Sequence, residues 1–331
     1  MKILYIYRNH NIAFSIGKVF KPIENEMKRY ADVQSIELPE ASYGLKALWK
    51  NIRFARNAVR NGGYDVVHIT GSEHYLIPFL KGLGAKVVVT VHDLGSIYQN
   101  NNGWLRQRVK TLLFVDTLKH ANRVTFISEK SRQEASQYTS LPTKVVDVIP
   151  DAVDSTYVRS EKNFNTECPR ILHIGTKPIK NLERVCHALK GIKCHLRIIG
   201  KLKEEYHILL NECGINYSNS FGLTDEEIHD EYKKCDIVSF ASVYEGFGMP
   251  IIEGQSVGRV VVTSNISPMK EVAGGGAVLV DPFDVASIKI GFEEAIVNHE
   301  KYVSIGLENV KHYTVVAIAK MYFDVYKKCM E

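Results

Sequence analysis

The chain has 331 residues, 45% of them hydrophobic and 24% charged, and a formal net charge of +5 at pH 7. This composition is typical of a globular protein, and the length predicts two domains, because one core of ordinary size takes up fewer residues. The sequence contains no run of the roughly eighteen apolar residues that a membrane span needs, and its first apolar run is too short for a signal peptide, so we expect a cytoplasmic protein.

Apolar runs of strand length alternate with helical stretches, and they do so twice. The first set is predicted at residues 3–7, 33–38, 65–69, 86–91, 123–127 and 145–149. The second set is predicted at residues 171–174, 195–199, 217–221, 236–240, 260–263 and 277–280. Unbroken apolar strands between helices indicate parallel sheets that are covered on both faces. We therefore predict an α/β protein with two doubly wound, Rossmann-like domains that meet in the polar stretch 154–167.

The most basic stretch of the first half covers residues 45–60. Five cations recur there at steps of three or four residues and so share one side of a predicted helix: Lys46, Lys50, Arg53, Arg56 and Arg60. The apolar residues lie mostly on another side: Leu48, Trp49, Ile52, Ala55 and Val59. Such a cationic face fits two roles, a solvated surface or a contact with anionic lipid headgroups or a lipid-diphosphate acceptor.

The six cysteines all lie in the second half of the chain and form no Cys-x-x-Cys pair. This spacing argues against a disulfide framework and against a zinc site. The sequence also has no Asp-x-Asp and no His/Cys cluster with ligand spacing. We therefore expect no metal and no bound cofactor.

Residues 245–253 read Glu-Gly-Phe-Gly-Met-Pro-Ile-Ile-Glu and follow a predicted strand. Pro250 favours the first position of a helix, and Gly258 is suited to its end. Glu245 is therefore expected in a loop and Glu253 on the helix.

This segment has the chemistry of a site for a nucleotide sugar. A helix N-terminus offers unpaired backbone N–H groups, and Gly246 and Gly248 let the backbone approach a bulky diphosphate. The two carboxylates would repel an anion unless they face hydroxyl groups, from which an ionised carboxylate accepts strongly. The other interpretation of the pattern is a capped strand-to-helix turn with solvated carboxylates.

The nine residues resemble the signature Glu-x7-Glu of the retaining glycosyltransferases of family 4. The resemblance implies the glycosyltransferase B fold, in which ligands bind in the cleft between two domains. Residues 1–157 would form the N-terminal, acceptor-side domain, completed by the C-terminal helix 315–331, and residues 158–314 the nucleotide-sugar domain. In the family, the residue matching Glu245 touches the transferred sugar, the amides from Phe247 through Gly248 to Met249 meet the sugar or diphosphate, and Glu253 holds the ribose.

The stretch 175–184 is similar to the phosphate-facing loop of the family. By this resemblance, Lys180 neutralises charge on the leaving diphosphate, an electrostatic effect that is large in transfer chemistry. The arginine that the family often adds is replaced at both candidate places, Thr176 and Ile179, and Lys177 would compensate as a point charge. For both lysines the alternative is a solvated side chain near a helix start.

Two segments of the first half resemble further site positions of the family. His92, in the stretch 87–94, would lie near the donor sugar, with its tautomer fixed by a carboxylate such as Asp93. The alternative is a buried histidine that is bonded to backbone. The stretch 14–18 takes the place of the family's glycine-rich loop, so Gly17 would lie over the diphosphate.

The resemblance implies a retaining, metal-independent glycosyltransferase. It would move a hexose-type sugar from a UDP- or GDP-sugar to a glycan or lipid-linked acceptor in the synthesis of bacterial cell-surface polysaccharide or glycolipid. Its partners would be these substrates and an anionic membrane at the inner face of the plasma membrane, with no nucleic acid. The alternatives are a phosphorylase or synthase of the same fold and a non-catalytic nucleotide-sugar-binding partner protein.

Overall fold

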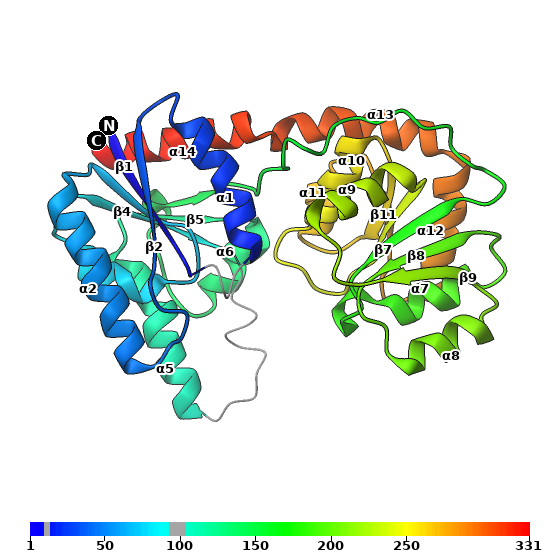
Figure 1. Ribbon diagram of the computed structural model, residues 1–331, viewed down its shortest axis with the longest axis horizontal. Helices are drawn as coiled ribbons and strands as arrows, with labels where there is room; N and C mark the ends of the chain where they lie inside the picture. The colour runs from blue at the N-terminus through cyan, green and yellow to red at the C-terminus, as the bar shows by residue number, and fades with distance from the viewer. Residues whose placement is uncertain (10–13, 93–103) are drawn as a thin grey trace. The chain divides into compact units, whose positions relative to one another are not determined.

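The computed structural model describes residues 1–9, 14–92 and 104–331 (Figure 1). The chain forms two compact units, Met1–Ala152 with Val315–Glu331 and Val153–Thr314. The division after residue 152 lies a few residues before the predicted boundary at 157, and the C-terminal helix rejoins the first unit. Among the helices of the described residues, none has both the length and the apolar character that crossing a membrane requires.

The first unit is built on a parallel sheet with the strand order β2-β1-β3-β4-β5-β6. Its strands are β1 (Lys2–Tyr7), β2 (Asp32–Glu37), β3 (Val66–Ile69), β4 (Lys86–Val91), β5 (Arg123–Phe126) and β6 (Val146–Val148). Each one coincides with a predicted apolar run, which confirms the α/β prediction for this half. The alternation of strand and helix predicts this architecture, because buried parallel strands need helices on both faces of their sheet.

Helices cover both faces of this sheet (Figure 1). One face carries α1 (Phe14–Met27) and α14 (Val315–Met330), which lie side by side. The other face carries α2 (Leu45–Gly62), α3 (Ile77–Leu80) and α5 (Trp104–Phe114), with α6 (Glu129–Ser136) packed near the end of β5. Short 3-10 turns complete the unit: η1 (His74–Leu76), η2 (Asp116–His120) and η3 (Thr143–Val145).

A buried histidine joins α14 to the sheet of the first unit. The Nδ1 atom of His68 lies 2.6 Å from the Tyr326 hydroxyl, and its Nε2 atom lies 2.8 Å from the Thr90 hydroxyl. Burial lowers the pKa of His68 to about 3, and nearby His92 adds to this effect. His68 is therefore a neutral core residue at pH 7, since desolvation disfavours the charged imidazolium.

The prediction of a loop at residues 14–18 is wrong, because α1 already begins at Phe14. Ile16 and Val19 are partly buried in the same cluster as the fully buried Phe20 and Ile23, at the spacing of a helix that packs on the sheet. Burial of this apolar face outweighs the turn tendency of Gly17. That glycine lies in the first turns of the helix, and among the described residues no atom outside its own stretch of helix lies within 4 Å of where its Cβ would be.

The second unit has a parallel sheet with the order β12-β11-β10-β7-β8-β9. Its strands are β7 (Arg170–Ile174), β8 (His195–Ile199), β9 (Asn216–Ser220), β10 (Ile237–Phe240), β11 (Val260–Ser264) and β12 (Val278–Val280). All six coincide with predicted runs. The order reverses between β7 and β10, and in doubly wound sheets ligands bind at the carboxyl ends of the strands at such a point.

Two layers of helices enclose this second sheet (Figure 1). One face packs against α7 (Leu182–Leu189), α8 (Glu204–Glu212) and α12 (Val285–Val297). The other face carries α9 (Asp225–Lys234), α10 (Met249–Val257), α11 (Met269–Ala273) and α13 (His299–Asn309). The turns η4 (Pro178–Lys180) and η5 (Val310–Tyr313) follow β7 and α13.

Candidate active site

The loops that follow β7 and β10 are tied together at the point where the strand order reverses. The two strands are direct neighbours, with His173 opposite Ser239. The backbone N–H of Val243 donates to the carbonyl oxygen of Ile179 at 2.9 Å. The buried amide of Asn181 donates to the carbonyl oxygens of residues 241 and 282 at 2.9 and 2.7 Å. These bonds fix three loops of the second unit at one end of its sheet.

Lys180 and Glu245 meet in this place. The Lys180 ammonium lies 2.6 Å from a carboxylate oxygen of Glu245, and both side chains are mostly buried, with 21% and 15% of their surface exposed. The ammonium also lies 4.9 Å from the centre of the Phe240 ring, which is the distance of a cation–π contact. The sequence places these residues 65 positions apart, and only the sheet brings them together.

A glycine makes room for the Lys180 side chain. Gly175 directly follows β7 and has a φ of +97°, and a Cβ at this position would lie 2.9 Å from Cγ of Lys180. An L side chain there would be both strained and too close, so we expect only glycine to serve. The family motifs predict no role for Gly175, although a glycine directly after a buried strand is a signal that the sequence does carry.

His173, the fourth residue of β7, is fully buried near Lys180. Burial lowers the pKa of His173 to about 4, and the positive charge of Lys180 contributes to this shift. The imidazole is therefore neutral at pH 7. Its Nδ1 atom lies 3.3 Å from the Ser239 hydroxyl, so the neutral ring links β7 to β10.

The N-terminus of α10 faces the same loops. Gly248 is the N-cap residue, with φ +127° and ψ 48°, and no side chain caps the first turn. Pro250 occupies the first turn, and Gly258 ends the helix in a left-handed conformation, so both predicted boundary residues are confirmed. The backbone N–H groups at this N-terminus, including those of residues 247–249, have no hydrogen-bond acceptor within the helix and are therefore suited to bind an anion.

Glu253 is held by a tyrosine that the sequence analysis missed. The hydroxyl of Tyr232, on α9, donates to the Glu253 carboxylate at 2.5 Å. Burial and the charge of Glu253 raise the pKa of Tyr232 well above its usual range, so the hydroxyl keeps its proton. Tyr157 packs edge-on against the Tyr232 ring at 5.3 Å. No local pattern could have identified these tyrosines, because neither belongs to a motif.

His92, in the first unit, has two protein neighbours. Its Nε2 atom donates to the carbonyl oxygen of Thr70 at 3.0 Å, and Nδ1 lies 3.9 Å from the buried carboxyl of Asp151. Burial raises the pKa of Asp151, and His92 partly opposes that shift. Asp93, the predicted carboxylate partner, lies outside the described residues. The backbone bond agrees with the alternative of a structural histidine, and contact with a sugar stays a prediction.

The other predicted donor residues are less engaged. Lys177 is exposed at the start of η4 and forms no ion pair with a residue that the structure describes. The Thr176 hydroxyl donates to the carbonyl oxygen of Lys201 at 2.8 Å. The Phe247 ring is buried and packs at 5.9 Å against Tyr313, which fixes the Gly-Phe-Gly segment in the second unit.

Both halves of the chain match known families. Residues 17–157 match Glycosyltransferase Family 4, and residues 155–311 match Glycosyl transferases group 1. The chain belongs to glycosyltransferase family 4. Its nine-residue signature begins in the loop after β10 and runs into α10, so Glu245 lies in the loop and Glu253 on the helix, as predicted.

Relatives and solved structures of this family 4 chain agree with the match. It is 27% identical over 285 residues to the serotype-specific mannosyltransferase WbdA of Escherichia coli; the match covers 74% of this chain and 34% of WbdA, so the chain spans about a third of that relative. It is similar to sucrose-phosphate synthase from Thermosynechococcus elongatus, with a TM-score of 0.79, 15% identity and coverage of 100% and 99%. It is also similar to Anabaena HepE in complex with UDP-glucose, with a TM-score of 0.72, 16% identity and coverage of 99% of both chains. These similarities show the glycosyltransferase B fold.

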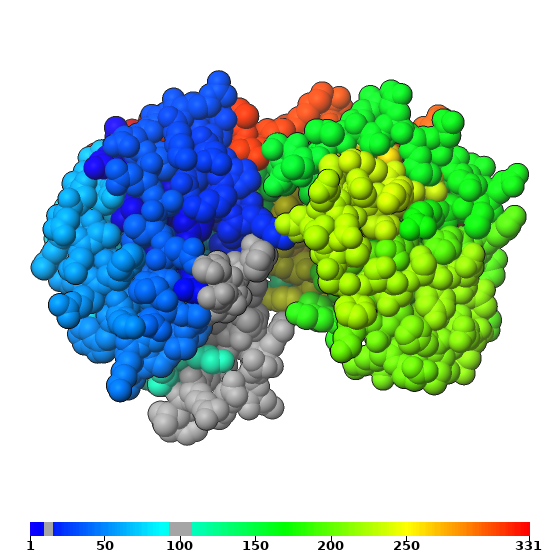
Figure 2. Space-filling model, viewed as in Figure 1, coloured from blue at the N-terminus to red at the C-terminus, as the bar shows by residue number. Residues whose placement is uncertain are grey.

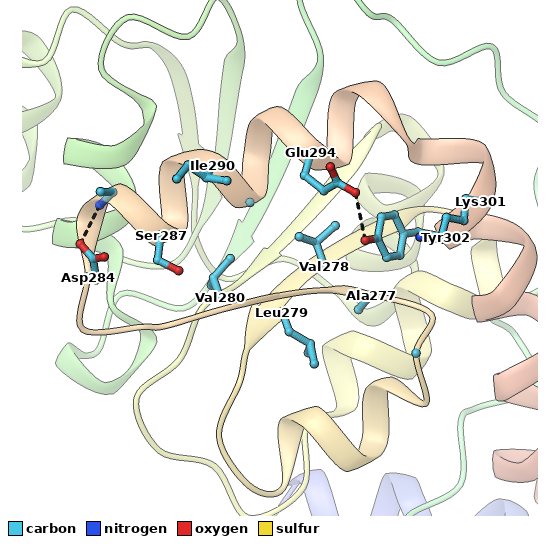
Figure 3. A pocket seen from close by; sticks show the side chains of 13 residues that line it. Ala277, Val278, Leu279, Val280, Asp284, Ser287, Ile290, Glu294, Lys301 and Tyr302 are labelled. Atoms are coloured by element: carbon cyan, nitrogen blue, oxygen red, sulfur yellow. Dashed lines mark hydrogen bonds between the residues drawn. The ribbon is translucent and has the colours of Figure 1, made fainter.

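The second unit of this family 4 chain also has a groove that lies apart from the predicted donor-site residues. It has a volume of about 690 Å³ and lies against the edge strand β12 and the helix α12, over Val278, Val280 and Ile290 (Figure 3). None of the predicted donor-site residues lines it. Within residues 1–9, 14–92 and 104–331, no group of three or more His, Cys, Asp or Glu residues is placed to hold a metal ion.

Proposed function

We propose that the chain is a retaining glycosyltransferase that uses no metal ion and transfers a hexose from a UDP- or GDP-sugar to a glycan or lipid-linked acceptor. The ion pair between Lys180 and Glu245 beside the N-terminus of α10 carries this proposal. The mannosyltransferase name of the relative WbdA makes mannose the first sugar to test, and its serotype-specific role points to cell-surface polysaccharide.

The donor site is proposed to lie at the carboxyl ends of β7 and β10. The amides of the first turn of α10 and the ammonium of Lys180 would hold the diphosphate, because the helix dipole and the lysine both favour negative charge there. A lysine ammonium has three donors, so Lys180 can serve the diphosphate and keep its bond to Glu245. Glu253, oriented by Tyr232, would accept hydrogen bonds from the ribose hydroxyls.

In the transfer step, the bond between the anomeric carbon and the diphosphate oxygen breaks, and a bond to an acceptor hydroxyl oxygen forms on the same face of the sugar. The proton of that hydroxyl passes to the leaving diphosphate. Lys180 stabilises the charge that grows on the leaving group, and this preorganised electrostatic stabilisation requires no metal. The Glu245 carboxylate positions the sugar, and the ion pair with Lys180 fixes its orientation.

The proposal is tested with purified protein, a panel of UDP- and GDP-hexoses and a mannose-containing acceptor. We expect release of one nucleoside diphosphate, in the presence of EDTA, and a product with the anomeric configuration of the donor by NMR. A product of inverted configuration would refute the retaining mechanism, and loss of activity in EDTA would refute metal independence. Nucleotide binding without release from any donor would instead indicate a non-catalytic partner protein.

We also propose that α2 contacts an anionic membrane at its inner face. The helix lies on the surface of the first unit, in the part coloured blue to cyan (Figure 2). Lys46, Arg53 and Arg60 are exposed and form no ion pair with a residue that the structure describes, whereas Lys50 pairs with Glu40.

The structure corrects one detail of this helix. Trp49 was predicted to lie mostly with the packing residues, but its side chain is 66% exposed, and Leu45, one turn earlier, is 80% exposed. Arg56 donates to the carbonyl oxygen of Phe79 at 2.8 Å and is only half-exposed. Trp49 therefore lies within the cationic face. An indole next to cations suits a membrane interface, because its ring is amphipathic.

A further inference from the structure

The strand β12 lies at one edge of the second sheet and differs in composition from the other edge strands. Its sequence is Val-Leu-Val, whereas β2, β6 and β9 each carry polar or charged side chains. Proteins usually protect the edge of a sheet with polar or charged residues, because an apolar edge with free backbone groups pairs with other strands. An apolar edge strand is therefore a candidate interface.

The middle residue of β12 presents its backbone to the open side of this edge. The carbonyl oxygen of Val280 accepts from the N–H of Asn265 at 2.7 Å, so the backbone of Val280 faces β11. Neighbouring residues of a strand turn their backbone groups to opposite sides, so the N–H and C=O of Leu279 point away from β11. Neither group has a hydrogen-bond partner among the residues that the structure describes. The edge is closed again just after β12, because the N–H of Asp281 donates to the Ser287 hydroxyl at 2.9 Å.

Apolar side chains flank the edge on both faces of the sheet. Val278 and Val280 point toward α12, and Leu279 points to the opposite face (Figure 3). Leu279 is 40% exposed, and Ile290, near the middle of α12, is 63% exposed. The groove of about 690 Å³ lies between the edge and this helix. A strand that paired with β12 would therefore cover Leu279 and the groove together.

Side chains of opposite charge lie at the two ends of the groove. Asp284 caps the N-terminus of α12, and Lys301 lies beyond the C-terminus of that helix, on α13 (Figure 3). Both side chains are exposed, and neither forms an ion pair with a residue that the structure describes. Glu294 also lines the Lys301 end, where its carboxylate accepts from the Tyr302 hydroxyl at 3.2 Å. The groove thus has a carboxylate at one end, an apolar centre, and an unpaired ammonium at the other end.

This arrangement is complementary to a second copy of itself. A copy related by a two-fold axis through β12 runs antiparallel, so the Asp284 end of each copy meets the Lys301 end of the other. At the axis the two Leu279 residues lie opposite each other and can exchange both backbone hydrogen bonds, as in an antiparallel ladder. Ile290 lines the same groove, so the two Ile290 side chains approach each other across the axis.

We propose that the chain forms a two-fold dimer in which the β12 strands of two copies pair antiparallel at Leu279 and join their second sheets. An unrelated extended segment would satisfy the backbone of Leu279, but only a copy of this groove brings the charges that match both of its ends. The predicted donor-site residues do not line the groove, so the dimer is independent of the proposed function.

Sedimentation velocity of the full chain over a series of micromolar concentrations measures the self-association. The variant Ile290→Glu places a carboxylate at the centre of the interface. Ile208→Glu is its matched control, because Ile208 is 53% exposed on α8 of the same unit. We expect Ile290→Glu to raise the dimer Kd about a hundredfold or more, since two-fold symmetry places the substitution in the interface twice. The control should leave the Kd within about threefold of the wild-type value.

An exchange of charges tests the antiparallel register. Lys301→Glu and Asp284→Lys should each weaken the dimer, because like charges then meet at both ends of the interface. An equimolar mixture of the two variants should dimerise again, since each supplies the charge that the other lacks. Asp284→Lys also removes the helix cap at the N–H of Ala286, so thermal melts check its folding. If it does not fold, Lys301→Glu and Ile290→Glu decide the matter.

Hydrogen exchange of the Leu279 amide gives a readout of strand pairing. The exchange should slow as the concentration of the wild-type chain rises. A wild-type chain that stays monomeric overturns the proposal, and so does a dimer in which this amide exchanges as fast as in the monomer. Equal effects of Ile290→Glu and Ile208→Glu, or a mixture of the charge variants that does not dimerise although both are folded, would also overturn it. A monomeric chain that binds an extended peptide of another protein in the groove would show that the occupant is not a second copy.

Discussion

Replacing Lys180 by alanine removes the cation that we place against the leaving diphosphate. The Lys180 ammonium lies 2.6 Å from the Glu245 carboxylate and 4.9 Å from the centre of the Phe240 ring. Gly175 leaves room for the methylene groups of the lysine. Alanine deletes the charge without adding bulk. The loss should fall on ligands with phosphate and not on the nucleoside alone, because the base and ribose do not contact the ammonium in the proposed complex.

The expected magnitude follows from the burial of the pair. Two unit charges 4 Å apart attract by about 4 kcal/mol at an effective dielectric constant of 20, and partial exposure reduces this value. A hydrogen bond to a charged group contributes a net of about 1.5–3 kcal/mol, which corresponds to about a ten- to hundredfold change in Kd. The stability cost should be smaller, about 1 kcal/mol or less, since Glu245 keeps some contact with solvent.

Isothermal titration calorimetry with UDP, GDP, inorganic pyrophosphate, uridine and guanosine measures the effect. Lys203→Ala is the control, because Lys203 pairs with Glu205 at 3.2 Å on the exposed surface of the same unit. We expect the Kd of the preferred nucleoside diphosphate and of pyrophosphate to rise in Lys180→Ala only, and nucleoside binding to stay within about threefold. Equal losses for nucleoside and diphosphate would show that Lys180 only supports the fold.

Three further results are expected. Glu245→Gln should leave the melting temperature and nucleotide binding nearly unchanged and lower kcat by about tenfold or more, because it weakens a contact that is stronger in the transition state; a variant with full turnover would remove Glu245 from the mechanism. The triple variant of Lys46, Arg53 and Arg60 to glutamine should stop sedimentation with anionic liposomes, since each cation near the surface contributes about 1 kcal/mol; wild-type protein that ignores such liposomes at low salt would contradict the membrane contact. The free energy of unfolding should fall as the pH decreases from about 6.5 towards 3. Burial holds the pKa of His68 at about 3 in the folded chain, whereas His68 of the unfolded chain already binds a proton below about pH 6.5. Thermal melts in which wild type and His68→Gln have the same dependence on pH would refute this assignment.

The sequence alone determined the alternation of strands and helices and the segment that carries the family signature. Both are local properties. A run of apolar residues such as β4 or β11 is buried wherever the sheet places it, and the turn from Gly248 into the helix that Gly258 ends depends on residues next to each other in the chain. The twelve predicted strands were therefore found, and so were the start and end of α10.

Other features depended on the tertiary structure. Residues 14–18 are helical and not a loop because Ile16 and Val19 pack against the first sheet. Trp49 is exposed because the side of a helix that is buried depends on what packs against it, and the apolar spacing of the sequence is compatible with more than one side. The same holds for the site. Lys180 meets Glu245 and Tyr232 meets Glu253 across long stretches of chain. The first pair exists because the order of the strands reverses next to β7, and strand order is a property of the whole sheet that no local pattern encodes. Tyr232 and Glu253 meet because α9 and α10 pack against each other on one face of the second sheet.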